Sequence, residues 1–108
     1  MRNKVDEGLL FTYYGGLLNQ HQKEVLRQYY DCDMSLSEIS EDMQISRQAV
    51  RDTIVRSQNK LVEYEQKLGL IAKIKNIATE FETILQENKF SVGEKEQLTI
   101  LLNKIKEI

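Results

Sequence analysis

Apolar residues recur at intervals of three and four along almost the whole chain, which is the spacing of one face of an α-helix. No segment shows the strict alternation of apolar and polar residues that marks a strand. The chain is therefore expected to be all-α. The pattern predicts helices at about residues 3–14, 19–30, 35–43, 46–68, 70–88 and from 91 to the end.

Polar residues mark where several of these helices begin. In a capping box, a Ser, Thr, Asp or Asn is followed three residues later by Glu or Gln, and each side chain bonds the other residue's backbone N–H. Ser46 is a further N-cap candidate, without such a partner. The predicted boxes pair Asn19 with Gln22, Ser35 with Glu38 and Ser91 with Glu94.

The predicted helices fall into two parts. Residues 1–68 are expected to form a four-helix domain whose last helix is long, and residues 69–108 a helical extension that starts at Gly69. Two helices are too few for a generous core. We therefore expect the extension to pack on the first part or against a second copy of the chain.

The stretch from Ser35 to Arg56 has the pattern of a helix-turn-helix, in which two helices cross steeply around a tight turn. Ser40 is small and allows a close approach. Gln44 stands where glycine is usual, and a left-handed backbone there costs roughly 1–2 kcal/mol for an ordinary residue. The apolar residues expected to hold the motif together are Leu36, Ile39, Met43, Ile45, Val50 and Ile54.

The second helix of this motif has a polar face opposite its apolar one. With Val50, Ile54 and Leu61 turned inward, Asn59 and several charged or polar residues point to solvent. The first turns of such a helix meet base edges in the major groove of DNA. The residues expected to contact DNA are Ser46, Arg47, Gln48, Arg51, Asp52, Val55 and Arg56.

Each of these side chains suits a different contact. Gln48 pairs well with adenine and Arg51 with guanine. Val55 either touches a thymine methyl group or belongs to a protein interface. Asp52 repels phosphate, so it either accepts from cytosine or orients a neighbouring arginine, Arg51 or Arg56.

Ser46, Arg47 and Arg56 are better placed for phosphate contacts. An alternative for the basic residues is that Arg56 and Lys60 pair with acidic neighbours on an exposed helix.

The formal net charge is −2, which argues against unspecific, charge-driven nucleic-acid binding. The basic residues are nevertheless concentrated between Ser46 and Lys60. An acidic protein that makes few phosphate contacts binds DNA weakly unless a second copy doubles these contacts. We therefore expect a homodimer. The apolar seam of residues 46–68 and the last two helices offer a dimer surface, and the alternative is that they form an intramolecular core.

Three segments resemble the region-4 domain of bacterial sigma factors, which reads a promoter element: residues 19–30, residues 35–40 and residues 45–50, the last with Ser46-Arg-Gln-Ala-Val50. Together with Tyr64-Glu-Gln-Lys-Leu68, they resemble the YlxM family of small helix-turn-helix proteins. This resemblance implies a winged-helix-like DNA-binding fold, double-stranded DNA as ligand and a role in transcription regulation.

The resemblance also implies a link to the signal recognition particle pathway. Two functions are therefore expected as alternatives. The first is a DNA-binding regulator. The second is a protein- or RNA-interaction module that acts on the signal recognition particle, its RNA or its receptor without binding specific DNA.

Little in the sequence supports catalysis, so we expect no enzyme, no catalytic or metal-binding residues and no cofactor. His21 is the only histidine and is expected at the surface or in a cap. Cys32 is the only cysteine and cannot form an internal disulfide, which together with the absence of a signal peptide favours the cytoplasm. The longest apolar run, residues 9–18, is too short for a membrane span.

Overall fold

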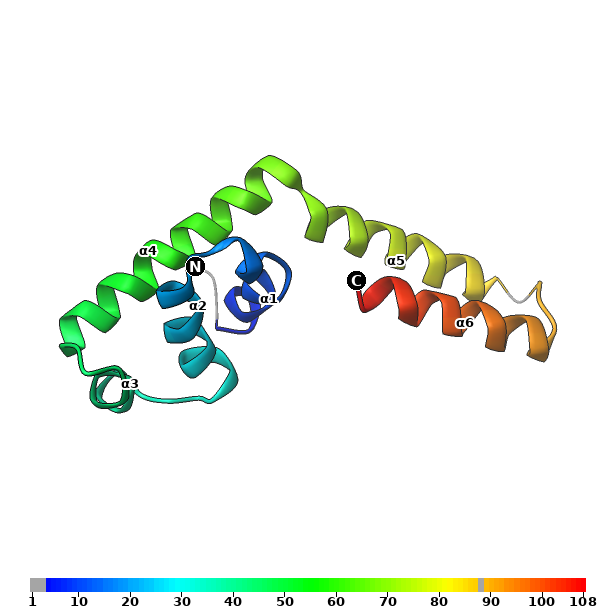
Figure 1. Ribbon diagram of the computed structural model, residues 1–108. Helices are drawn as coiled ribbons and strands as arrows, with labels where there is room; N and C mark the ends of the chain where they lie inside the picture. The colour runs from blue at the N-terminus through cyan, green and yellow to red at the C-terminus, as the bar shows by residue number, and fades with distance from the viewer. Residues whose placement is uncertain (1–3, 88) are drawn as a thin grey trace. The chain divides into compact units, whose positions relative to one another are not determined.

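The computed structural model describes residues 4–87 and 89–108, and within them helices are joined by short turns and no strand occurs. The predicted all-α fold is confirmed (Figure 1). The predicted helix start at Asn3 and helix end at Asn88 lie outside the described residues. The elements are α1 (Lys4–Tyr14), η1 (Gly15–Leu17), α2 (Gln20–Leu26), η2 (Arg27–Asp31), α3 (Leu36–Met43), α4 (Arg47–Leu68), α5 (Leu70–Gln86) and α6 (Val92–Lys106).

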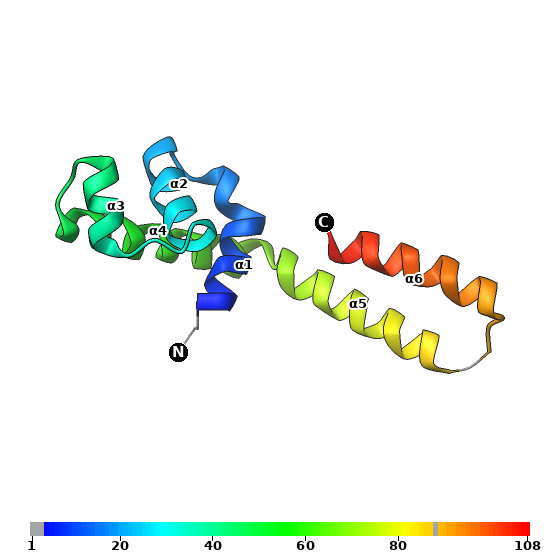
Figure 2. The same cartoon turned by 90° about the horizontal axis from the view of Figure 1, so that it is seen from below.

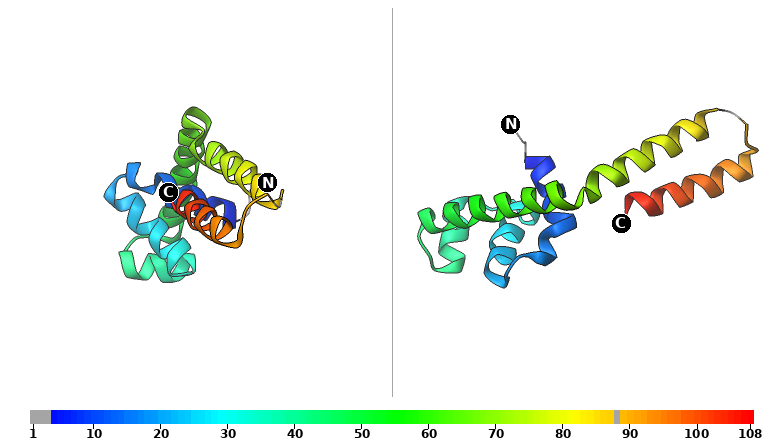
Figure 3. Two further views of the ribbon diagram at one scale, coloured as in Figure 1. Left: turned by 90° about the vertical axis from the view of Figure 1, so that its right-hand side faces the viewer. Right: turned by 90° about the horizontal axis from the view of Figure 1, so that it is seen from above.

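The chain divides into two compact units between Leu68 and Gly69. The N-terminal unit contains α1 to α4, and the C-terminal unit is a hairpin of α5 and α6. In the N-terminal unit, α1, α2 and α3 all lie on one side of α4 (Figure 1), and in the view from above α1 crosses the line of α4 (Figure 3, right). Its core is the layer between these three helices and α4. Side chains with no exposed surface are Val25, Leu26, Ile39, Val50, Ser57 and Leu61.

The predicted capping boxes are all present, and they explain where α2, α3 and α6 begin. At Asn19, for example, the Oδ1 atom accepts from the Gln22 backbone N–H at 2.8 Å. The Asn19 backbone N–H donates in return to Gln22 Oε1 at 3.2 Å. Two backbone donors that the helix leaves without partners are satisfied in this way.

The helix predicted at residues 19–30 is not α-helical throughout. It is α-helical only to Leu26 and then widens into the π-helical turn η2. Here the Cys32 N–H donates to the Arg27 carbonyl at 3.1 Å. A turn of this kind inserts a residue into the helix, and Gln28 is consequently carried into the interior, where only 3 % of its surface is exposed.

Gly15 and Gly16 follow the last residue of α1 and form the start of η1. A Cβ atom added to buried Gly15 would lie 2.8 Å from the ring of Phe11, closer than real contacts allow. A larger residue at position 15 would therefore force the Phe11 ring to shift.

Tyr14 and Tyr30 connect the earlier helices of the N-terminal unit to α4. Tyr14 is buried against Tyr64, with ring centroids 6.2 Å apart, and its hydroxyl donates to Glu65 on α4. Tyr30 is half-buried, and its oxygen accepts from Gln58 Nε2 at 2.8 Å. Burial raises the pKa of Tyr30 to about 12.

The apolar seam of α4 is used inside the N-terminal unit. Val50, Ile54, Ser57 and Leu61 are buried there, whereas Leu68 is 54 % exposed. The expectation that this seam serves a dimer is therefore wrong for its buried part, because α1, α2 and α3 already cover it. The intramolecular alternative holds for these residues.

In the C-terminal unit, α5 and α6 run side by side in opposite directions (Figures 1 and 2). Ile71, Ile74, Ala78 and Leu102 are its buried apolar residues. Glu82 and Lys106 form an ion pair of 2.5 Å between the two helices. Other residues of the predicted apolar faces remain about half exposed, among them Ile77, Ile84 and Leu101.

Candidate nucleic-acid interface

A tight turn joins α3 to α4. Gln44 adopts the predicted left-handed backbone, with φ 57° and ψ 43°. The Ile45 N–H then donates to the Ser40 carbonyl at 3.1 Å, which closes the end of α3. Half-buried Ile45 lies between the two helices of the motif. The strain at Gln44 is tolerated because Ile39 and Val50, one on each helix, are completely buried.

Ser46 begins the second helix of the motif, as predicted. Its Oγ atom accepts from the Ala49 N–H at 3.0 Å, and its carbonyl accepts from Val50 N–H at the same distance. Val50 and Ile54 then fix the rotation of α4 about its axis, since both are buried. The opposite face of the helix consequently points to solvent.

The structure brings the predicted contact residues together on this exposed face. They occupy the cap and the first turns of α4, and none of them is covered by the N-terminal unit. Val55, the single apolar member, has 48 % of its surface exposed. The exposed residues are Ser46, Arg47, Gln48, Arg51, Asp52, Val55 and Arg56.

Asp52 has a partner that the sequence analysis did not foresee. Gln48 Nε2 donates to Asp52 Oδ1 at 3.0 Å, one helical turn away. Asp52 therefore orients Gln48, whereas Arg51 and Arg56 were the expected partners. The second amide hydrogen and the carbonyl oxygen of Gln48 stay available, and these are the groups that pair with adenine.

The basic residues in the first half of α4 have no acidic partner in the part of the chain that the structure describes. Among the described residues, Arg47, Arg51 and Arg56 form no ion pair, and neither does Lys60. The alternative that Arg56 and Lys60 pair with acidic neighbours is thus not what the structure shows. Their charge is directed to solvent.

A buried amide fixes α3 against the preceding turn. Gln28 Nε2 donates to Asp42 Oδ2 at 2.7 Å and to Glu24 Oε1 at 3.0 Å. Gln28 Oε1 is buried and has no partner in the described part of the chain. Sequence reasoning missed this clamp, because glutamine usually lies at the surface and only the widened turn η2 directs it inward.

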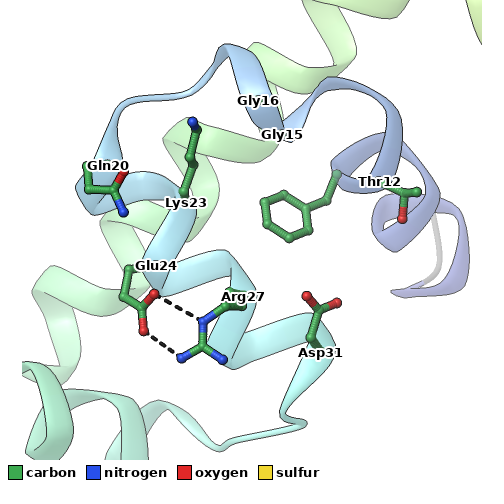
Figure 4. Close-up of a pocket in the computed structure, with 9 residues that line it drawn as sticks. Thr12, Gly15, Gly16, Gln20, Lys23, Glu24, Arg27 and Asp31 are labelled. Atoms are coloured by element: carbon green, nitrogen blue, oxygen red, sulfur yellow. Dashed lines mark hydrogen bonds and ion pairs between the residues drawn. The ribbon is translucent and has the colours of Figure 1, made fainter.

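A shallow hollow of about 500 Å³ lies on another surface of the N-terminal unit, lined by residues of α1, η1, α2 and η2 (Figure 4). Arg27 donates to both carboxylate oxygens of Glu24, at 2.7 and 3.0 Å. These bonds lower the pKa of Glu24 to about 2. No α4 residue lines the hollow, so it does not belong to the interface described above.

The remaining candidates for chemistry are separate from one another. His21 and Cys32 are both exposed, and Cys32 Sγ accepts from Arg27 Nη1 at 3.2 Å. No group of three or more His, Cys, Asp or Glu side chains suitable for a metal ion occurs in the residues that were described. Within the same residues, no helix combines the length and the apolar character that a membrane crossing requires.

These features define the class of protein: a helix-turn-helix protein whose second motif helix is capped, exposed and basic on its outer face. Residues 1–104 match the model of the UPF0122 family, described as "Putative helix-turn-helix protein, YlxM / p13 like". The chain belongs to this family.

Relatives of the chain carry the same family name. A UPF0122 protein of Clostridium botulinum is 38 % identical over 100 residues, which cover 91 % of this chain and 92 % of the relative. One of Bacillus cereus is 40 % identical over 99 residues, covering 82 % and 90 %. One of Desulforamulus reducens is 48 % identical over 65 residues, but this match covers only 60 % of the chain and 56 % of that protein.

Proposed function

We propose that the protein is a DNA-binding regulator that reads duplex DNA with the first turns of α4. The observation that carries this proposal is the exposure of Gln48 and Arg51 side by side on the second helix of a helix-turn-helix, with the buried Val50 fixing the direction of both. Such residues meet base edges when the helix enters the major groove.

We assign the individual contacts from the chemistry of each exposed side chain. Gln48, held by Asp52, pairs with adenine, and Arg51 donates to both acceptors of guanine. Each good pair contributes about 1–3 kcal/mol of discrimination. Arg47 and Arg56 flank these residues and contact phosphates, as does the Ser46 hydroxyl. Val55 contacts a thymine methyl group or a neighbouring protein surface.

The protein acts as a homodimer, because an acidic chain with a short basic surface needs two copies of that surface for useful affinity. It works by binding and not by catalysis, and its compartment is the cytoplasm. Its regulatory role is exerted on, or together with, the signal recognition particle pathway, the link that the family resemblance implies.

A second function is favoured by one observation, the acidic surface next to the recognition helix. In α3, Glu38, Glu41 and Asp42 are exposed and no basic residue accompanies them. These carboxylates repel a DNA backbone that approaches closely. In this alternative the protein keeps the fold but binds the protein, RNA or receptor of the signal recognition particle.

Selection from a pool of random duplex DNA separates the two functions. With the intact chain at low salt, we expect particular sequences to be enriched. Arg51→Ala should abolish the enrichment at its guanine, because the discrimination against wrong bases there is about 1–3 kcal/mol, or roughly fivefold to 150-fold.

The matched control is Lys67→Ala, which removes one positive charge from the last turn of the same helix. It should lower affinity only slightly and leave the selected sequence unchanged. Equal enrichment by the Arg51→Ala protein would contradict our assignment of this residue. If no sequence is enriched while particle protein or RNA co-purifies with the chain, the second function replaces the first.

A further inference from the structure

The two long edges of the α5–α6 hairpin differ in character. One edge, which we term the apolar edge, consists of Leu70, Ile77 and Ile84 on α5 and Leu101 on α6. These side chains are 37 %, 50 %, 50 % and 47 % exposed. On α5 they repeat every seven residues, which places them in one line along the helix.

The position of this line follows from the residues next to it. Ile77 directly precedes buried Ala78, and Leu101 directly precedes buried Leu102. In an α-helix, the residue before a given residue points about 100° away from it around the helix axis. Because α5 and α6 run in opposite directions, this rotation turns both side chains to the same side of the hairpin.

The opposite edge confirms this geometry. Glu82 and Lys106 each follow a half-buried residue, Phe81 and Ile105 respectively. One step forward must therefore turn both toward the other side, and there they form their ion pair of 2.5 Å. That edge is closed by charges within the hairpin, whereas the apolar edge is left open.

Charged residues beside the apolar edge show which partner fits it. Lys73 and Lys104 each lie three residues after an edge residue, near the open end of the hairpin. Glu80 and Glu87 have the same position relative to the edge, nearer the α5–α6 connection, and Glu87 is paired there with Lys89 at 3.4 Å. All four are exposed. The surface is thus basic toward one end and acidic toward the other.

We propose that the apolar edge binds the same edge of a second copy of the chain, with the two hairpins antiparallel. This arrangement sets Lys73 near Glu80 of its partner, and a parallel arrangement would oppose like charges. In the antiparallel arrangement Ile77 of one copy contacts Ile77 of the other, and Leu70 of one copy contacts Ile84 of the other. The surface is therefore complementary to itself. The result is a four-helix bundle.

This proposal deepens the homodimer of the proposed function by naming the surface that forms it. Its test is the mass of the full chain in solution over a range of micromolar concentrations, measured by sedimentation without DNA. We expect a dimer. Ile77→Lys should raise the dimer dissociation constant about a hundredfold or more, since two buried isoleucines are lost and two charges are brought together.

The matched control is Ile100→Lys. Ile100 is 56 % exposed on the same hairpin but lies two residues before Leu102, on the outer face of α6. This variant loses the same side chain and gains the same charge, yet should remain dimeric. Circular dichroism of both variants reports whether the helices persist.

A charge exchange tests the orientation without altering the apolar residues. Lys73→Glu should weaken the dimer, and adding Glu80→Lys should restore most of the loss. A monomeric wild-type chain, an Ile77→Lys protein that still dimerises, or a control that dissociates equally would each overturn the proposal. Failure of the charge exchange to restore association would overturn the antiparallel orientation. None of these outcomes depends on whether DNA is bound.

Discussion

The two units of the chain solve the same problem, the burial of apolar helix faces, to different degrees. In the N-terminal unit, residues such as Leu26, Ile39 and Leu61 have no exposed surface at all. In the C-terminal unit even the best-covered residue, Leu102, is 4 % exposed, and several large apolar side chains are about half exposed. Three helices on a fourth can enclose a core, whereas two helices can cover only one stripe of each other.

This difference also separates the tasks of the two units. The N-terminal unit completes its core with its own residues and can leave the polar face of α4 to a ligand. The C-terminal unit leaves apolar side chains exposed, and an exposed apolar surface is typical of a region that binds another protein. Substitutions in the two cores test this difference in packing.

The largest effect is expected from Val50→Asp, which places a carboxylate in the fully buried contact of α4 with α3. A buried charge without a partner costs several kcal/mol. The N-terminal unit should therefore unfold, with a large loss of helical circular dichroism. Val55→Asp introduces the same charge at an exposed valine of the same helix and should leave the signal intact. Preserved helicity in the first variant would mean that the inward face of α4 has been assigned incorrectly.

A smaller effect, and a direct comparison, comes from Leu→Ala in each core. Leu61→Ala should lower the free energy of unfolding of the N-terminal unit by about 3–4 kcal/mol, since the surrounding helices cannot close the cavity. Leu102→Ala should cost about 2 kcal/mol, near the lower limit for such changes, because the hairpin can adjust around it. Thermal unfolding of both variants measures the difference. Equal losses would show that the hairpin is as tightly packed as the N-terminal core.

The smallest effect is a gain. Gln44→Gly should stabilise the N-terminal unit by about 1 kcal/mol, because glycine adopts the left-handed backbone at this turn without steric cost. The same substitution at exposed Gln66, inside α4, should destabilise by about 1 kcal/mol. The urea midpoints of the two variants should thus move in opposite directions. A loss of stability at both positions would show that Gln44 makes a contact worth more than its strain.

Much of the N-terminal unit could be predicted from the sequence, because its signals are local. Ser35 and Glu38 are close enough in the chain to identify a cap, and the spacing of Val50 and Ile54 fixes one helical face. The burial of Gln28 could not be predicted, since it depends on a widened turn that no short pattern encodes. The predicted contact residues are exposed as expected, while their binding to DNA remains a prediction.

The apolar pattern of the C-terminal unit could be predicted, but not its use. The periodicity places both Ala78 and Ile77 on the apolar face of the helix, but only Ala78 is buried. Which of two adjacent apolar lines faces the neighbouring helix depends on the rotation of both helices. That rotation is a property of the pair and is not contained in either sequence segment.

The clamp between Gln28 and Asp42 has a consequence for motion. An isolated helix as short as α3 would spend most of its time unwound in water, and Ile39 is its only fully buried side chain. The amide–carboxylate bond therefore adds to the free energy of local opening, by about 1.5–3 kcal/mol. Hydrogen exchange of the α3 amides reports this opening directly, and it should accelerate when the clamp is removed, well before the rest of the N-terminal unit loosens.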